Sequence, residues 1–156
     1  MKNLAPNQPL YLYQEPMFAL TVSTVLVVDN GVLLVELDNG TEDKDICGFP
    51  GGMVRAGLET IQFAAVRYVK EQTGIMLRKD LLIPVDFRSD PSRSKEGNIV
   101  DIGFACMLEN HPNEFTLPVK WREVNFETRK AVDNIYFFRD HEVLLDRALE
   151  IVTIMK

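Results

Sequence analysis

The segment with the clearest chemical pattern runs from residue 51 to residue 75 and reads GGMVRAGLETIQFAAVRYVKEQTGI. Its two leading glycines have no Cβ, so their backbone can approach a phosphate group or a metal ion closely. Positions 68, 71 and 72 would share one face of a helix, because they are three and four residues apart. Three carboxylates there would suit a hard cation such as Mg²⁺. Only Glu71 is acidic, and Tyr68 and Gln72 stand at the other two positions.

This segment resembles the Nudix box. The family pattern is Gly, five residues, Glu, seven residues, Arg-Glu, an aliphatic residue, any residue, Glu-Glu, any residue, Gly and an aliphatic residue. The residues that fit this pattern are Gly51, Gly52, Glu59, Arg67, Val69, Glu71, Gly74 and Ile75. Tyr68 and Gln72 replace two family glutamates, and six residues instead of five separate Gly52 from Glu59, with Leu58 taken as the extra one. Because a phenol is a poor Mg²⁺ ligand and glutamine brings no charge, these replacements predict a weakened site.

The resemblance implies a Mg²⁺ (or Mn²⁺) site with Glu71, Glu59 and the backbone carbonyl of Gly52 as ligands, and it makes Glu71 and Glu59 the candidate catalytic residues. Arg67 and Gly74 are structural positions of the pattern. An alternative stays open for each glutamate. Glu59 either contacts the metal or braces the loop through Arg67, which is the favoured role. Glu71 either binds the metal or pairs with Arg67 on the helix surface.

A second stretch, Phe87 to Leu108 (FRSDPSRSKEGNIVDIGFACML), resembles the loop and strand of ADP-ribose-type Nudix proteins, where an Asp-Pro-x-Arg loop precedes the strand. Arg88 and Arg93 flank the Asp-Pro pair, and a guanidinium can bind two phosphate oxygens at once. Both are predicted to bind substrate; the alternative is a solvated loop. Gly51 and Phe49 complete the predicted substrate site, although filling the core is the favoured role of Phe49.

In the Nudix family the base that activates water often comes from outside the box. The sequence does not choose among its candidates, which are Glu96, Glu109, Glu114, Glu123 and Glu127. Each of them is more often a solvated surface charge. Asp140 and His141, at the start of a predicted helix, could support acid–base chemistry, but a structural role is favoured there, with Asp140 as the helix cap.

Two functions follow from these residues. The first is a metal-dependent Nudix hydrolase, a pyrophosphohydrolase with an atypical box. It would cleave a nucleoside diphosphate linked to another group, such as an ADP-ribose-like compound, and the loss of two glutamates would weaken it. The alternative is a non-catalytic Nudix-fold sensor that binds ADP-ribose or a related nucleotide. A third, weaker interpretation is a structural subunit with a vestigial pocket. The family resemblance favours the enzyme, and the residues at positions 68 and 72 favour the sensor.

Hydrophobic periodicity indicates the elements that must position these residues. Strands are predicted over 19–29, 32–37, 81–87, 99–108 and 119–124, and helices over 60–73 and from 140 onward. This order predicts an α/β (α+β) Nudix fold, in which a mixed β-sheet is packed between helices as an α/β/α sandwich. Prolines at positions 6, 9 and 16 make residues 1–16 an extended N-terminal arm, and residues 17–156 are predicted to form a single Nudix domain.

Composition narrows the class of protein further. The chain has 156 residues, with 23 acidic and 17 basic ones, and shows no basic stripe, which argues against a nucleic-acid partner. No apolar run approaches the ~18 residues of a membrane span, and no signal peptide is recognisable, so we expect no membrane partner and a cytoplasmic location. Cys47 and Cys106 are predicted to be small buried hydrophobes. The expected partner is a small nucleotide ligand, and the resemblance also raises a homodimer, since many Nudix proteins dimerise.

Overall fold

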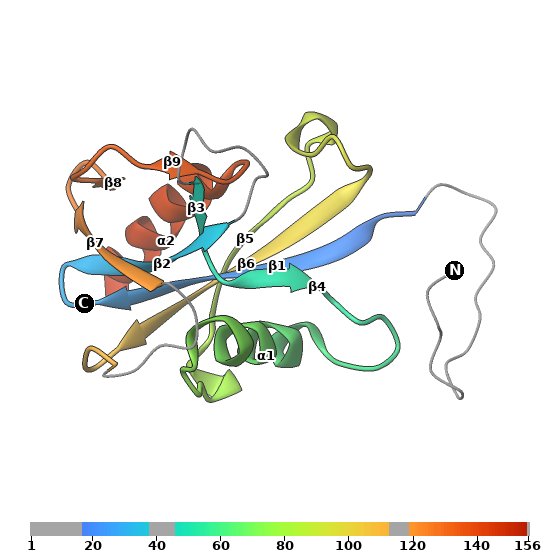
Figure 1. Ribbon diagram of the computed structural model, residues 1–156, viewed down its shortest axis with the longest axis horizontal. Coiled ribbons are helices and arrows are strands. Elements are labelled where there is room, and N and C mark those ends of the chain that lie inside the picture. The colour runs from blue at the N-terminus through green and yellow to red at the C-terminus, as the bar shows by residue number, and fades with distance from the viewer. Residues whose placement is uncertain (1–16, 38–45, 113–118, 156) are drawn as a thin grey trace.

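A computed structural model describes residues 17–37, 46–112 and 119–155 (Figure 1). Its strands are β1 (Ala19–Val28), β2 (Gly31–Leu37), β3 (Ile46–Gly48), β4 (Gly51–Met53), β5 (Ile83–Arg88), β6 (Ile99–Leu108), β7 (Val119–Asn125), β8 (Lys130–Ala131) and β9 (Tyr136–Phe137). The helices are α1 (Ile61–Thr73) and α2 (His141–Met155), with 3-10 turns at Lys79–Leu81 and Pro91–Arg93. The predicted arm over residues 1–16 lies outside the described residues. No helix of the described part of the chain is both long and apolar enough to cross a membrane.

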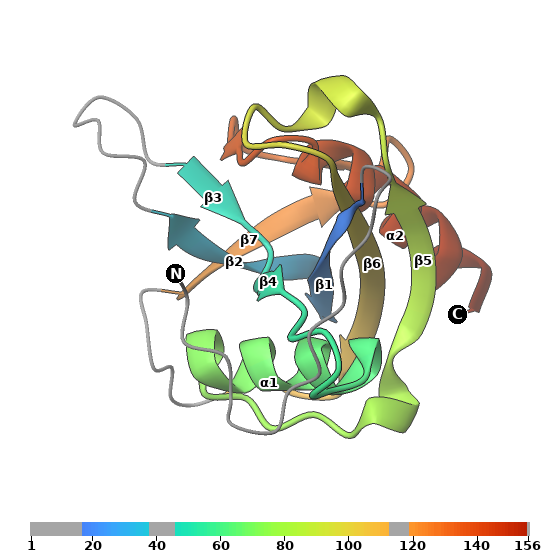
Figure 2. The same cartoon turned by 90° about the vertical axis from the view of Figure 1, so that its right-hand side faces the viewer.

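Strand β1 organises a mixed sheet because it has neighbours of both directions. It runs parallel to β6 over its whole length, and β6 is antiparallel to β5 on the other side. The opposite edge of β1 is shared: β4 pairs antiparallel with residues 21–23, and β2 pairs antiparallel with residues 26–28. Figure 2 shows β2 and β4 as two separate strands beside β1. The strand that carries the two glycines is therefore fixed directly against the central strand.

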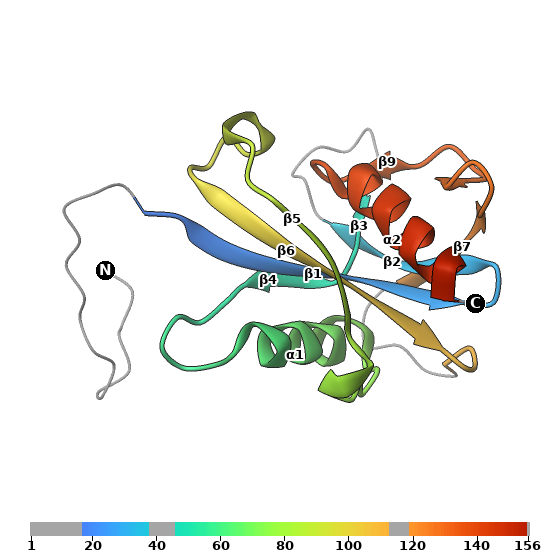
Figure 3. The same cartoon turned by 180° about the vertical axis from the view of Figure 1, so that it is seen from behind.

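The two helices cover opposite faces of this sheet, as Figures 1 and 3 show. Side chains along a strand alternate between its faces. Leu26 and Val28 accordingly pack in one cluster with Val69 of α1, whereas Val25 and Val27 pack in another with residues of α2 such as Leu145. All of these side chains are buried, and full burial of one such side chain contributes about 1.5–3 kcal/mol. The predicted α/β/α arrangement of a mixed sheet between helices is confirmed.

The boundaries of most predicted elements are close to the observed ones. The hairpin of β1 and β2 and the strand over 99–108 are confirmed. Helix α1 begins one residue later than predicted, because Thr60 is its N-cap and accepts a hydrogen bond from the Phe63 N–H. It ends before Gly74, which has a left-handed φ of 81°. The strand predicted over 81–87 is shifted, since the chain first forms the 3-10 turn at Lys79–Leu81. Both cysteines are buried, as expected.

Candidate functional site

The loop before α1 is held by an ion pair between Glu59 and Arg67. The Arg67 guanidinium donates through Nε to one Glu59 oxygen at 2.8 Å and through Nη2 to the other at 2.6 Å. The Arg55 N–H donates to the same carboxylate at 2.9 Å, and the Glu59 side chain is 5% exposed. These contacts, the Arg67 hydrogen bond above all, lower the pKa of Glu59. The extra residue in the loop, taken as Leu58, therefore leaves the Glu59–Arg67 brace intact.

The two residues that replace family glutamates bind the backbone of β4. The Gln72 amide donates to the Gly51 carbonyl and accepts from the Gly51 N–H, each at 2.9 Å. The Tyr68 hydroxyl donates to the Met53 carbonyl at 2.8 Å, and its ring fills the space where a Cβ on Gly52 would lie. A glutamate at position 72 has no N–H to donate when ionised, so it could not satisfy the Gly51 carbonyl. Tyr68 and Gln72 thus fasten β4 to α1 through neutral hydrogen bonds.

The predicted metal ligands do not, as placed here, form a site that fits Mg²⁺. Glu59 is occupied by Arg67, and Gly52 is paired with Val22 in the sheet. Glu71 is 51% exposed and lies 3.4 Å from the Arg67 guanidinium. Among the residues the structure describes, no three His, Cys, Asp or Glu side chains are grouped to hold a metal ion. Since Mg²⁺ requires near-octahedral oxygen ligation, a single exposed carboxylate is a poor donor set.

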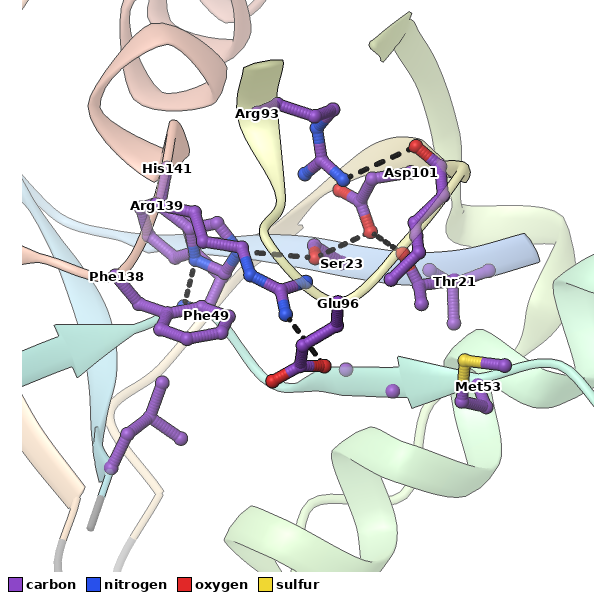
Figure 4. A pocket seen from close by; sticks show the side chains of 15 residues that line it. Thr21, Ser23, Phe49, Met53, Arg93, Glu96, Asp101, Phe138, Arg139 and His141 are labelled. Carbon is purple, nitrogen blue, oxygen red and sulfur yellow. Dashed lines mark hydrogen bonds and ion pairs between the residues drawn. The ribbon is translucent and has the colours of Figure 1, made fainter. Parts of the chain in front are cut away.

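A cavity of about 360 Å³ opens beside the two glycines (Figure 4). Five segments line it: the first half of β1, the end of β2 at Leu37, the strand β4 with the preceding Phe49, the loop before β6 with the start of that strand, and the residues around the start of α2. Its volume lies within the range of about 300–1,000 Å³ that is usual for small-molecule sites. Of the predicted substrate-binding residues, Phe49, Gly51 and Arg93 line this cavity, whereas Arg88 is not among the described residues that do.

Arg88 and Arg93 are bound by carboxylates rather than solvated, those of the buried Asp101 and the partly buried Asp140. Arg88 contacts Asp101 and donates to Asp140 at 2.6 Å, and Arg93 donates to both oxygens of Asp140 at 2.9 Å. The two side chains are 8% and 4% exposed. Burial alone would raise the pKa of Asp140, but the hydrogen bond from Arg93 and the charges of both arginines lower it. Asp140 directly precedes α2, but its carboxylate binds these two arginines, so its role as the helix cap stays a prediction.

His141 extends this network along the base of the cavity. Its Nδ1 accepts from the Phe49 N–H at 3.0 Å, so Nε2 carries the proton and faces Ser23 Oγ at 3.4 Å. Ser23 in turn donates to Asp101 at 3.1 Å. Burial lowers the pKa of His141 to about 4, which keeps the ring neutral at pH 7. The ring stacks on Phe49, with 5.7 Å between centroids, so both residues support the core as well as the cavity.

The sequence analysis did not single out Arg139, which lines the cavity from the residues before α2. Its Nη2 lies 3.0 Å from Glu96, and its guanidinium lies over the Phe138 ring at 4.7 Å from the centroid. Of the described candidates for a base, Glu96 lines the cavity, whereas Glu123 accepts from Asn30 at a β-turn. Glu114 lies outside the described residues. The sequence signal that could have pointed to Arg139 is an arginine that follows an aromatic residue directly before a predicted helix.

The fold and this box define the class of protein. A family model described as NUDIX domain matches residues 17–126, and the chain therefore belongs to the Nudix family. An ADP-ribose pyrophosphatase of Methanocaldococcus jannaschii is 36% identical over 134 residues, which cover 86% of this chain and 73% of that protein. The chain is thus a member of a hydrolase family with an ADP-ribose pyrophosphatase among its relatives.

Two solved structures extend the comparison. The NUDIX domain of Shewanella oneidensis NrtR complexed with ADP ribose has a TM-score of 0.69 at 19% identity and covers 96% of this chain and 94% of that one. A bifunctional NMN adenylyltransferase/ADP ribose pyrophosphatase of Francisella tularensis, complexed with AMP and an Mn ion, has a TM-score of 0.57 at 23% identity. This chain spans only 42% of that protein, and 97% of this chain is covered. These two likenesses show the fold; the absence of a nucleic-acid partner and the homodimer stay predictions.

Proposed function

We propose that this chain binds a nucleoside diphosphate sugar of the ADP-ribose class in the cavity beside β4, and that its site serves binding rather than cleavage. The observation that carries the proposal is that polar groups of the Nudix box, residues 51–75, are bonded to one another. Gln72 bonds both peptide groups of Gly51, Tyr68 bonds the Met53 carbonyl, and Arg67 bonds the Glu59 carboxylate. Of the predicted metal ligands, Glu59 and Gly52 are engaged within the protein, and Glu71 is half exposed beside Arg67.

The cavity supports binding of such a ligand by its shape and its lining. Phe138 offers partly exposed aromatic surface, and Arg139 supplies a cation for phosphate oxygens. The relative from Methanocaldococcus jannaschii is an ADP-ribose pyrophosphatase, and the Shewanella NUDIX domain was crystallised with ADP ribose. These names favour ADP-ribose as the first ligand to test.

Calorimetric titration with ADP-ribose, in EDTA and in Mg²⁺ or Mn²⁺, tests this proposal when the same samples are analysed for products. We expect binding of equal affinity with and without metal, and intact ligand after incubation. At 100 times its dissociation constant the ligand should stabilise the fold by about 2.7 kcal/mol. AMP and ribose 5-phosphate appearing at catalytic rates would contradict the proposal.

Metal-dependent hydrolysis is the second candidate, because Glu96 lines the cavity and the 36% identical relative is a pyrophosphatase. In that case ADP-ribose should be cleaved in Mg²⁺ or Mn²⁺ and not in EDTA. The substitution Glu96→Gln should then lower turnover by about 10²–10⁴-fold, as expected for loss of a general base. Glu150→Gln, which removes the exposed carboxylate partner of Arg129 on α2, is the matched control and should keep full turnover.

A further inference from the structure

Three arginines surround the cavity or its base, and they differ in what binds them. Arg88 and Arg93 are buried and bonded to the carboxylates of Asp101 and Asp140. Arg139 is 18% exposed, and its carboxylate partner, Glu96, is 76% exposed. Water and salt compete for the largely exposed Glu96 carboxylate, so this pair exchanges partners more readily than the pairs of Arg88 and Arg93. Of these three arginines, Arg139 is the one whose contacts a ligand can replace at small cost.

The backbone of Arg139 adds a second, independent observation. Among the described residues, the non-glycine residues with positive φ are Asp29, Arg129 and Arg139. The first two lie in turns that connect strands, whereas Arg139, with a φ of 48°, lies directly before α2. A non-glycine residue with this backbone conformation is strained, and it keeps the conformation only where the surrounding structure fixes it. Here Asp140, fixed by two arginines, follows immediately, and Phe138 stacks on the guanidinium (Figure 4).

We propose that Arg139 binds the diphosphate of the ligand and that Glu96 is a counter-ion which the phosphate oxygens displace. This inference rests on the proposed function, because it needs a phosphorylated ligand in the cavity. The guanidinium offers parallel N–H donors to two phosphate oxygens. Asp101, a second carboxylate that lines the cavity, is already bonded to Arg88, so it does not compete for Arg139. Once displaced, Glu96 can turn into solvent, since it is largely exposed already.

Calorimetric titration of ADP-ribose into four variants tests this pairing. Arg139→Ala should weaken binding about 10- to 100-fold, the range for loss of a hydrogen bond to a charged group. Glu96→Gln should tighten binding about two- to fivefold, because it removes the competing carboxylate. The double variant should bind like Arg139→Ala, since Glu96 acts through Arg139. Arg78→Ala removes an arginine from the exposed Arg78–Asp80 pair and should bind like the wild type.

The possible outcomes separate this inference from the function on which it rests. Wild-type protein that fails to bind ADP-ribose overturns both. Wild-type binding with an Arg139→Ala variant that binds equally well overturns the role of Arg139 alone. If circular dichroism shows that Arg139→Ala is unfolded, Arg139→Lys and Glu96→Gln decide. The lysine variant, which keeps the charge but not the planar fork, should bind about three- to tenfold more weakly. An affinity that Glu96→Gln leaves unchanged or reduces contradicts displacement.

Discussion

The two walls of the cavity fix their backbone in opposite ways. One wall is formed by β4, and behind it neutral donors from Tyr68 and Gln72 of α1 hold the carbonyls of Met53 and Gly51. The wall formed by β6 and the start of α2 is instead held by buried charges, with Arg88 between Asp101 and Asp140. A neutral hydrogen bond contributes about 0.5–1.5 kcal/mol net, whereas removing one partner of a buried ion pair leaves an uncompensated charge.

This difference distinguishes the polar groups that already have partners within the protein from those that a ligand can bind. The polar groups of each wall contact one another, on one wall through amide and hydroxyl groups and on the other through ion pairs. Arg139 and Glu96 also line the cavity, and Glu96 is the largely exposed member of their pair. Substitutions on the charged wall should therefore affect stability most, and those on the exposed face of α1 least.

The largest effect should come from Asp101→Asn. Asp101 is buried and accepts hydrogen bonds from Thr21 and Ser23 while it contacts Arg88. Asparagine keeps the shape but removes the buried carboxylate bonded to Arg88, which then retains only Asp140 at 2.6 Å and Asp86 at 3.4 Å, so we expect a loss of about 3 kcal/mol or more in the free energy of unfolding. Urea unfolding at pH 7 measures it. Asp80→Asn, which removes the partner of exposed Arg78, should cost less than about 1 kcal/mol. Equal losses in the two variants would contradict the contrast.

A pH dependence should follow from His141 on the same wall. Burial lowers its pKa to about 4, against about 6.5 in the unfolded chain. Between these values the unfolded chain binds a proton that the native state does not, so stability falls as the pH drops from 6.5 towards 4. At 1.36 kcal/mol per pKa unit the loss approaches about 3 kcal/mol. Urea midpoints between pH 7 and 4.5 should show this slope in the wild type.

Two histidine variants test whether His141 causes this dependence of stability on pH. His141→Gln should flatten it, because glutamine does not titrate. His111→Gln changes a surface histidine that pairs with Asp29, and it should leave the slope as it is in the wild type. A slope that survives in His141→Gln would mean that other groups cause it.

On the neutral wall, Gln72→Glu should cost about 1–3 kcal/mol. The carboxylate cannot donate to the Gly51 carbonyl, so a partly buried acceptor loses its partner.

The double variant Gln72→Glu, Tyr68→Glu places two further carboxylates beside Glu71. Mn²⁺ should then raise the melting temperature of the double variant but not of the wild type. Thermal unfolding in EDTA and in Mn²⁺ measures both effects. A wild-type melting temperature that rises equally with Mn²⁺ would show that the native box binds metal.

The helix of the box was predictable from its local residue pattern, whereas its bracing pair came from the resemblance to the Nudix pattern. Glu59 and Arg67 are eight residues apart, and they meet because the loop before α1 folds back along the helix. The arginine network was not predictable in this way. Arg88 meets Asp101 and Asp140 from 13 and 52 residues away, and the contact exists only because β5, β6 and the start of α2 converge.

Arg139 was not identified from the sequence for a related reason. Its position over the cavity depends on a left-handed backbone and on the neighbouring aromatic ring, and neither feature follows from local propensity. Tyr68 and Gln72 were recognised as unusual from the pattern alone. Their bonds to β4, however, depend on how closely β4 approaches α1, which only the packed structure specifies.

The smallest effect should come from Glu71→Gln, and it decides the role that the sequence left open for this residue. Glu71 is half exposed and pairs with Arg67 at 3.4 Å along one face of α1. Such a pair contributes about 0.2–0.5 kcal/mol, so the melting temperature and ADP-ribose affinity should barely change. Glu59→Gln, which breaks a nearly buried pair with the same arginine, should cost clearly more. If Glu71→Gln instead abolished metal-dependent cleavage of ADP-ribose, Glu71 would be a metal ligand and the site would be that of an enzyme.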